Sequence, residues 1–220
     1  MCDLPLVRAS STHDFDFIVD LVDDRLALVD CRKPRIRPVI IDLDQPWRAT
    51  GVDLLRRAIG RQSSSVIDAT AGFGRDAIHL ARLGLEVTAI ERCQPIALLL
   101  DDAILCARDE AASRIRLLPD DSLRCLEHHH ADVVYVDPMF DASRGLKSLP
   151  RKAMQVAREL AGDDVDARDL AAIARRHFKR VVVKRPDKSP PLVDGVHHSH
   201  CGNTVRYDVY LLDGPVENET

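Results

Sequence analysis

Residues 66–91 read VIDATAGFGRDAIHLARLGLEVTAIE, and this stretch decides the fold. An apolar run ends at Asp68, a turn with Gly72 and Gly74 follows, and a helical period leads to a second apolar run that ends at Glu91. This order predicts a strand, a turn, a helix and a second strand, with glycines that let the backbone approach a ligand. The stretch therefore predicts the nucleoside-binding unit of an open α/β sheet.

The length and composition suit one α/β domain with a small appendage. The chain has 220 residues, 45% hydrophobic and 30% charged, so it can bury a core without disulfides. The net charge is −4, so any contact with nucleic acid must come from a local patch. Residues 138–190 hold a basic surplus of thirteen Lys and Arg against seven Asp and Glu. We predict a β-hairpin subdomain at 1–47 and a main domain at 48–220.

Cysteine and histidine patterns give no sign of a metal site. The six cysteines form no CxxC pair, which argues against a zinc ribbon or a disulfide framework. His128–His130 and His197–His200 fall in predicted loops without acidic clusters at ligand spacing, so no metal is expected. No basic segment with an apolar core opens the chain, and no apolar run approaches about eighteen residues. We predict a soluble, cytoplasmic protein without a membrane partner.

The remaining elements follow from apolar periods and the turns that bound them. Residues 15–22 and 26–29 predict a hairpin around Asp23-Asp24, and the period at 52–59 predicts a helix that stops at Gly60. Beyond Glu91 the chain predicts a helix from Pro95 to Ala107, a helical region ending at His177, and strands at 115–119, 133–136, 180–184 and 205–212. Strands that alternate with helices predict a doubly wound sheet.

The glycines alone do not identify the nucleoside. Gly72 to Ala77 matches G-x-G-x-x-A, which is typical of dinucleotide-dependent oxidoreductases. Two features favour a different chemistry: Asp68 precedes the glycines, and the strand at 133–136 runs directly into Asp137-Pro138-Met139-Phe140.

That strand end suits methylation of an exocyclic amino group. The nitrogen lone pair is delocalised into the base, so acceptors must draw on the N–H protons while the amine is held in line with a sulfonium methyl. Asp137 and the Pro138 carbonyl can accept these protons, and Phe140 can stack on the base, a contact worth roughly 1–3 kcal/mol. Positioning can supply ~7–11 kcal/mol of the barrier, so neither a metal nor a covalent nucleophile is needed.

A set of motifs resembles the bacterial small-subunit ribosomal RNA guanine-N2 methyltransferases of the J type. The motifs are Asp68-Ala-Thr-Ala-Gly-Phe-Gly-Arg-Asp76, Glu91-Arg92, Leu100-Asp-Asp102, Val136-Asp-Pro-Met-Phe140, Lys147-Ser148, Arg151-Lys152-x-Met154 and Val182-Val-Lys-Arg-Pro-Asp187. The resemblance covers roughly residues 52–212. It implies a Rossmann-like class I fold that binds S-adenosylmethionine, with the strand at 205–212 antiparallel to the strand at 180–184. It also implies methyl transfer to a guanine N2 in 16S ribosomal RNA, as free RNA or in the small subunit.

The resemblance also extends the list of candidate site residues. The turn itself offers Asp68, Gly72 and Gly74 as cofactor contacts, and the resemblance adds Arg75, Asp76, Glu91, Arg92, Asp121, Ser122 and Asp137. Glu91 would accept the ribose hydroxyls, and Asp121 or Ser122 would contact the adenine edge. The candidate catalytic residues are Asp137, Pro138 and Phe140. Candidate RNA contacts, by charge beside these strand ends, are Arg144, Lys147, Arg151, Lys152, Lys184 and Arg185.

Two other functions remain open from the residues alone. A nicotinamide-dependent oxidoreductase would account for the glycine pattern, and a non-catalytic RNA-binding module would account for the basic surplus. The two functions differ in the ligand they predict. The oxidoreductase would bind a dinucleotide, whereas the RNA-binding module would bind RNA but neither a dinucleotide nor S-adenosylmethionine.

Overall fold

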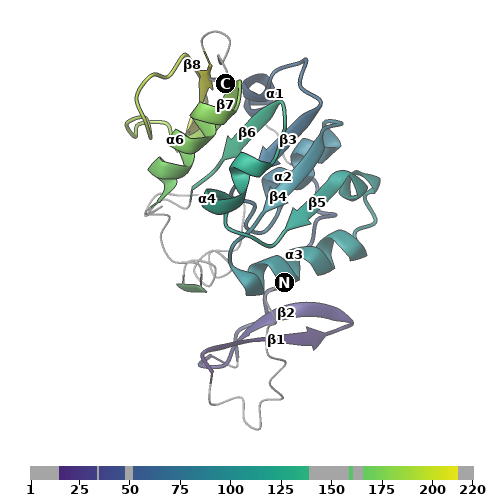
Figure 1. The fold of residues 1–220 in the computed structure, drawn as a ribbon. Coiled ribbons are helices and arrows are strands. Elements are labelled where there is room, and N and C mark those ends of the chain that lie inside the picture. Colours follow the sequence, from purple (N-terminus) through teal and green to yellow (C-terminus); the bar gives the residue numbers. More distant parts are fainter. Residues whose placement is uncertain (1–14, 34, 48–51, 139–158, 161–165, 213–220) are drawn as a thin grey trace.

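The computed structural model describes residues 15–33, 35–47, 52–138, 159–160 and 166–212. Within these ranges a seven-stranded sheet lies between two layers of helices, and a two-stranded hairpin lies beside this body (Figure 1). No helix in the described part of the chain is long and apolar enough to cross a membrane.

The N-terminal hairpin consists of β1 (Phe17–Val22) and β2 (Arg25–Asp30), which pair in antiparallel fashion. Asp23 and Asp24 connect the two strands with φ angles of 50° and 60°. Positive φ at both central residues matches the right-handed twist of a tight hairpin, and aspartate tolerates this conformation better than most residues. The predicted hairpin is confirmed.

The central sheet is doubly wound. Its strands are β3 (Ser65–Asp68), β4 (Glu86–Ile90), β5 (Ile115–Leu118), β6 (Val133–Val136), β7 (Arg180–Pro186), β8 (His198–Cys201) and β9 (Val205–Leu211). Their order is β5-β4-β3-β6-β7-β9-β8, with β3 to β7 parallel and β9 antiparallel to both neighbours. The predicted fold class and the antiparallel final strand are confirmed. Winding reverses between β3 and β6, so their carboxyl ends form the switch point where open sheets bind ligands.

Helices cover both faces of the sheet, which explains the nearly continuous apolar character of the central strands. One face carries α1 (Leu54–Ile59), α2 (Arg75–Arg82), α3 (Gln94–Cys106) and the short 3-10 helix η2 (Glu110–Arg114). The other carries α4 (Ser122–Cys125), the 3-10 helix η3 (Leu126–His128) and α6 (Ala167–His177). The predicted helices at 52–59 and 95–107 are confirmed, with Asp53 capping α1 and Pro95 in the first turn of α3.

One prediction of a loop is wrong. His198–Cys201 forms β8 at the edge of the sheet and pairs with β9. The segment has no apolar alternation, so its sequence carries no strand signal. Backbone pairing with β9 makes the strand, and the Ser199 hydroxyl donates to Asp208 Oδ1 at 2.6 Å.

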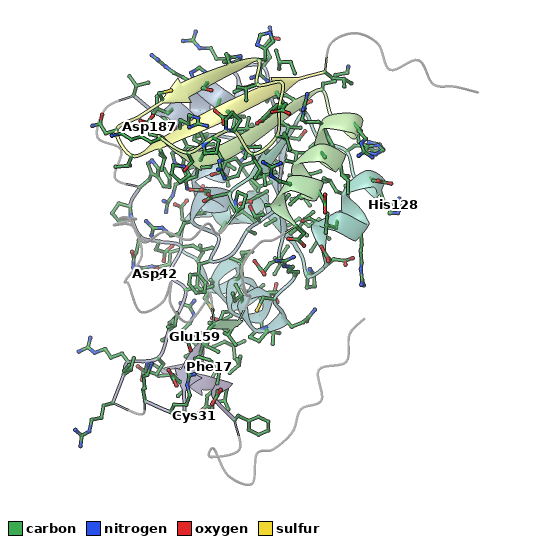
Figure 2. All side chains as sticks on the ribbon, turned by 90° about the vertical axis from the view of Figure 1, so that its left-hand side faces the viewer. Phe17, Cys31, Asp42, His128, Glu159 and Asp187 are labelled. Carbon is green, nitrogen blue, oxygen red and sulfur yellow. The ribbon has the colours of Figure 1, made fainter. Side chains whose placement is uncertain are left out.

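The hairpin is joined to the main body by charged side chains. Arg25 Nε lies 2.7 Å from Asp102 Oδ2 on α3. The Arg32 guanidinium stacks on the Phe17 ring and pairs with Glu159. Phe17 and Glu159 lie together at the end of the molecule remote from Asp187 (Figure 2).

The connector after the hairpin packs on the main domain. Trp47 stacks on His79 of α2, with ring centroids 3.8 Å apart. His79 in turn bonds Asp53 at 2.7 Å, so the connector, α1 and α2 are held together. The domain boundary between residues 47 and 48 adjoins residues outside the described ranges and stays a prediction.

Candidate active site

The turn after β3, residues 69–74, is held by groups from three neighbouring strand ends. Gly72 N–H donates to Glu91 Oε2 at 2.8 Å, beyond β4. Ser122 Oγ donates to the Ala69 carbonyl at 2.6 Å, beyond β5. The Asp137 N–H donates to Thr70 Oγ1 at 2.7 Å, beyond β6. The structure therefore brings three of the predicted site residues, Glu91, Ser122 and Asp137, around one turn at the switch point.

Glu91 is oriented by the backbone on both sides. Its Oε2 accepts the Gly72 N–H, and its Oε1 accepts the Cys93 N–H at 2.7 Å. The residue is only 8% exposed, so the carboxylate is held in one place. Both oxygens of the carboxylate thus accept backbone N–H groups. These two bonds orient the carboxylate beside the turn after β3.

The two glycines of the turn serve different purposes. A Cβ on Gly72 would have only the Thr70 carbonyl oxygen near it, at 3.9 Å, so the space beside Gly72 is open. A Cβ on Gly74 would overlap the buried Leu100 side chain and crowd Leu43. Gly74, with φ +69°, therefore allows the turn to pack on α3, whereas the expectation was that it makes room for a ligand.

A buried polar cluster lies beside the turn, on the face of the sheet that α2 covers. Lys184 Nζ donates to Asp76 Oδ2 and to Asp137 Oδ2, both at 2.8 Å. The Tyr135 hydroxyl also donates to Asp76 Oδ2, at 2.6 Å. The exposed fractions of the side chains are 12% for Asp76, 15% for Lys184 and 33% for Asp137. Asp137 is thus the member that opens to the outside.

The cluster contains more carboxylates than cations. Burial, and next the charge of Asp76, raise the pKa of Asp68 well above its usual value, which favours its neutral form. Burial would also raise the pKa of Asp76, but the Lys184 ammonium outweighs it and lowers that pKa. At Asp137 burial prevails over Lys184 and raises the pKa to about 6. Near pH 7 the cluster of Asp76, Asp137 and Lys184 carries a net negative charge.

The other predicted cofactor residues lie at the same edge of the sheet. Asp121 caps α4 by accepting the Leu123 N–H at 3.0 Å. Arg92 Nη1 lies 2.6 Å from Asp166 Oδ2, at the start of α6. Arg75, the first residue of α2, has a buried Nε without a hydrogen-bond partner among the described residues. Such an atom is a natural contact for a bound ligand.

Two of the predicted RNA contacts are not exposed cations. Lys184 lies in the buried cluster, and Arg185 is 7% exposed and donates to the Pro190 carbonyl at 3.1 and 3.0 Å. The prediction that both contact RNA phosphates does not fit these internal contacts. Successive strand residues point to opposite faces, so both side chains enter the protein, one on each side of the sheet. The other four, Arg144, Lys147, Arg151 and Lys152, lie outside the described residues, as do Met139 and Phe140.

Sequence reasoning missed Tyr135, Thr70 and the role of Lys184. The alternation of side chains along a strand could have identified two of them, because residues two apart point to the same face of the sheet. Tyr135 lies two residues before Asp137, and Lys184 lies two residues after the buried Val182. The bond from Asp137 N–H to the Thr70 hydroxyl joins residues 67 positions apart and left no local signal.

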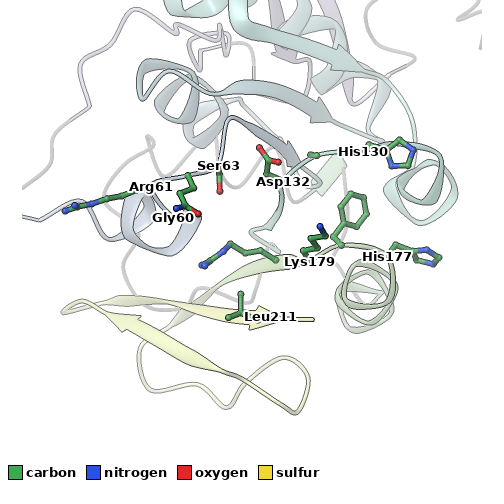
Figure 3. Close-up of a pocket in the computed structure, with 12 residues that line it drawn as sticks. Gly60, Arg61, Ser63, His130, Asp132, His177, Lys179 and Leu211 are labelled. Carbon is green, nitrogen blue, oxygen red and sulfur yellow. The ribbon is translucent and has the colours of Figure 1, made fainter. Parts of the chain in front are cut away.

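A hollow of about 850 Å³ lies elsewhere, at the amino ends of the strands (Figure 3). Its lining includes Ser63 before β3, Asp132 before β6 and Lys179 before β7. None of the candidate cofactor residues that the structure describes lines it. This hollow is therefore separate from the turn after β3.

A family model described as a putative SAM-dependent methyltransferase matches residues 6–212. This protein belongs to that family. The methyltransferase is therefore an enzyme whose cofactor is S-adenosylmethionine (SAM). Membership decides against the oxidoreductase and the non-catalytic RNA-binding module that the residues alone left open.

Relatives of this methyltransferase carry a more specific name. It is 37% identical over 228 residues to the ribosomal RNA small subunit methyltransferase J of Ectopseudomonas mendocina, covering 94% of this chain and 86% of the relative. It is 41% identical over 171 residues to the protein of that name from Stutzerimonas stutzeri, covering 71% of this chain and 66% of the relative. A solved SAM-dependent methyltransferase from Neisseria gonorrhoeae matches with a TM-score of 0.68 at 29% identity, covering 90% of this chain and 83% of that one.

The described residues of the methyltransferase fit SAM. The open space beside Gly72 leaves backbone accessible, and Glu91 places a carboxylate, the usual acceptor for a ribose diol, beside it. The buried Arg75 Nε can donate to a ligand. The surplus of carboxylates around Asp137 can offset the positive charge of a sulfonium.

Proposed function

We propose that this methyltransferase modifies the exocyclic N2 of a guanine in 16S ribosomal RNA, in the cytoplasm. The names of its relatives support a small-subunit ribosomal RNA substrate. The observation that carries the proposal is the position of Asp137, which follows β6, bonds Thr70 of the cofactor turn and leads into Pro138. An acceptor beside a methyl donor is what a weakly nucleophilic amine requires.

Two side chains of the protein would accept the proton that the guanine amine loses and hold the accepting carboxylate in place. When bound, SAM supplies a methyl group on a positively charged sulfonium. The guanine amine must give up one proton when it is methylated, and the Asp137 carboxylate can accept it. A pKa of about 6 leaves Asp137 mostly ionised at pH 7 yet basic enough to take a proton, which suits a general base. Lys184 holds this carboxylate at 2.8 Å and so limits its rotation.

The cofactor contacts of this proposal are the turn residues Asp68, Gly72 and Gly74, with Arg75, Asp76, Glu91, Arg92, Asp121, Ser122 and Asp137. Their roles differ in kind. Asp68 and Gly74 are buried and Asp76 is nearly so, and these three would shape the site, whereas Gly72 and Glu91 lie at its open space. Pro138 and Phe140 would complete the base pocket, and Arg144, Lys147, Arg151 and Lys152 would contact phosphates.

Methylation of unmodified 16S RNA tests the function. Wild-type protein, SAM with a tritiated methyl group, and either 30S subunits or bare 16S RNA should give label that nucleoside analysis assigns to N2-methylguanosine. Asp137→Ala should lose the activity while RNA affinity changes little, and Asp20→Ala, on the remote hairpin, is the control. Wild-type protein that binds SAM but labels neither substrate would overturn the proposal.

A further inference from the structure

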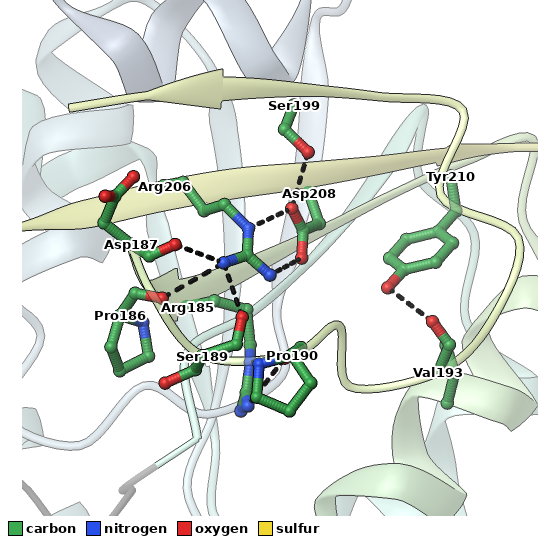
Figure 4. Close-up of polar contacts among 10 residues, drawn as sticks. All are labelled: Arg185, Pro186, Asp187, Ser189, Pro190, Val193, Ser199, Arg206, Asp208 and Tyr210. Atoms are coloured by element: carbon green, nitrogen blue, oxygen red, sulfur yellow. Dashed lines mark hydrogen bonds and ion pairs between the residues drawn. The ribbon is translucent and has the colours of Figure 1, made fainter.

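Two buried arginines hold a surface turn, residues 186–190, which we call the 186–190 turn. Arg206 Nη1 lies within hydrogen-bond distance of three of its carbonyl oxygens, those of Pro186 at 3.2 Å, Asp187 at 2.6 Å and Ser189 at 2.6 Å (Figure 4). Arg185 donates to the carbonyl of Pro190. Four carbonyls of a five-residue turn are thereby bound to two guanidinium groups.

Arg206 is itself fixed by a buried ion pair. Its Nε and Nη2 donate to the two oxygens of Asp208 at 2.7 and 3.0 Å, and Ser199 adds a third bond to that carboxylate (Figure 4). Arg206 is 8% exposed and Asp208 is 0% exposed. Burial of such a pair is costly unless its geometry is good and its remaining hydrogen-bonding groups are satisfied, as they are here. This arrangement makes the 186–190 turn rigid.

Lys188 is the cation that this turn presents to solvent, between the exposed Pro186 and Pro190. The turn follows β7 at the carboxyl edge of the sheet, four residues after Lys184, which touches Asp137. Four residues span roughly 13 Å at most, so the backbone of Lys188 lies near the proposed reaction site. Lys184 and Arg185 are buried, so Lys188 is the exposed cation of this strand end.

The surrounding charges favour an anion. The basic groups are Arg168, Arg185, Lys188 and Arg206, and the acidic groups that act on the two buried arginines are Asp187 and Asp208. Four positive against two negative charges leave a local surplus of two. Arg168, near the start of α6, is exposed, and so is Asp169 beside it. The chemistry that matches such an edge is a phosphodiester backbone.

We propose that Lys188 contacts a phosphate of the RNA substrate and that Arg206 positions it by holding the 186–190 turn. This inference rests on the proposed function, since it assumes an RNA substrate. The buried network would favour RNA binding, because a turn that is fixed before binding loses little conformational entropy when the substrate binds. Lys188 replaces Lys184 and Arg185 as the phosphate contact at the end of β7.

Lys188→Ala tests the contact, with Lys179→Ala as its matched control. Lys179 is an exposed lysine just before the same strand, at the opposite edge and in the hollow of Figure 3. Binding of a 16S RNA fragment should be measured over a range of KCl concentrations. Lys188→Ala should weaken binding and reduce the slope of log K against log salt by about 0.7–0.9, the value for one phosphate contact. Lys179→Ala should keep the slope, and both variants should bind SAM as the wild type does.

Arg206→Lys tests the positioning. This variant keeps the charge but loses the bidentate pair with Asp208, so its RNA affinity should fall as in Lys188→Ala. The double variant, Lys188→Ala with Arg206→Lys, should bind RNA no more weakly than either single variant. Lys188→Arg keeps the positive charge, so it should bind RNA more tightly than Lys188→Ala does. This test does not depend on whether Arg206→Lys folds. The inference is wrong if wild-type protein binds RNA while Lys188→Ala and Lys179→Ala match it in affinity and slope. Wild-type protein that binds SAM but no RNA would instead refute the proposed function.

Discussion

The Lys184 ammonium lies 2.8 Å from Asp137 Oδ2, and this contact ties the end of β7 to the end of β6. The same ammonium lies 2.8 Å from Asp76 Oδ2 on α2. One cation thus joins three elements that meet around the proposed reaction site. Its charge also opposes the effect of burial on Asp137, and that opposition can be measured.

Lys184→Met should shift the pH dependence of methyl transfer. Burial raises the pKa of Asp137 to about 6 even though Lys184 lowers it, so removal of the cation should raise that pKa further. A carboxylate that must be ionised to accept a proton then works only at higher pH. The acid limb of the single-turnover rate should move above pH ~6. An unchanged midpoint would contradict the role assigned to Lys184.

The same variant has a signature in stability. In this variant Asp76 and Asp137 lose the cation that they share. Their ionised forms then become more costly to bury than their protonated forms, so the pKa values of both in the folded state rise. A carboxyl whose folded pKa is raised costs stability as pH rises through the interval between its unfolded and folded values. The deficit in melting temperature should therefore be smaller at pH 5 than at pH 8. Lys179→Met, at the exposed end of the strand, should show no such trend.

Glu91→Gln should weaken SAM binding about tenfold or more, the loss expected when a charged acceptor becomes neutral. The N–H groups of Gly72 and Cys93 both point at this side chain. A glutamine has one acceptor oxygen, so its NH₂ would face one of these donors and disturb the turn. Calorimetric titration with SAM measures the effect. Glu86→Gln, an exposed position at the start of the strand that Glu91 follows, is the control, and equal affinities for Glu91→Gln and wild type would refute the assignment.

Gly74→Ala and Gly72→Ala should differ in kind. The first pushes a methyl group into buried Leu100 at a positive φ, so unfolding in urea should show a loss of about 3 kcal/mol. In Gly72→Ala the added methyl group meets open space, so only the positive φ destabilises the fold, and the free energy of unfolding should fall by roughly 1 kcal/mol. SAM affinity should fall more for Gly72→Ala, measured under conditions where both variants are folded. Similar stability losses in the two variants would contradict this division.

Asp132→Asn should destabilise the protein near neutral pH but not in strong acid. Asp132 Oδ2 accepts the Ser64 N–H at 2.8 Å, the Ser64 hydroxyl at 2.8 Å and the Ser65 N–H at 3.0 Å. The backbone bond from Ser64 comes first among the causes that lower the pKa of Asp132 to about 2. A depressed pKa gives stability that is present above about pH 4 and lost as pH falls toward 2.

The size of this effect is modest because the carboxylate is exposed. Solvent screening reduces the value of its hydrogen bonds, so we expect a loss of about 1 kcal/mol at pH 7. Unfolding free energies of wild type and variant should converge between pH 4 and pH 2. A gap that stays constant across this window would show that Asp132 acts through packing.

The sequence by itself determined the order of the elements, the glycine turn after β3 and the acid that follows β6. Each depends on a local pattern: apolar runs of strand length, a helical period after Gly74, and an acid directly after the fourth central strand. The strand at 205–212 also shows its alternation locally, and the structure pairs it with β7 as expected. These features could be predicted because neighbours along the chain decide them.

Only the tertiary structure decided what the polar residues of the candidate site contact. Lys184 and Arg185 are adjacent basic residues in the sequence, yet alternation sends one to Asp137 and the other to the Pro190 carbonyl. Gly74 faces Leu100 because α3 packs there, which a glycine pattern cannot reveal. Such contacts join residues far apart in the chain, so their geometry exists only once the sheet has brought the strand ends together.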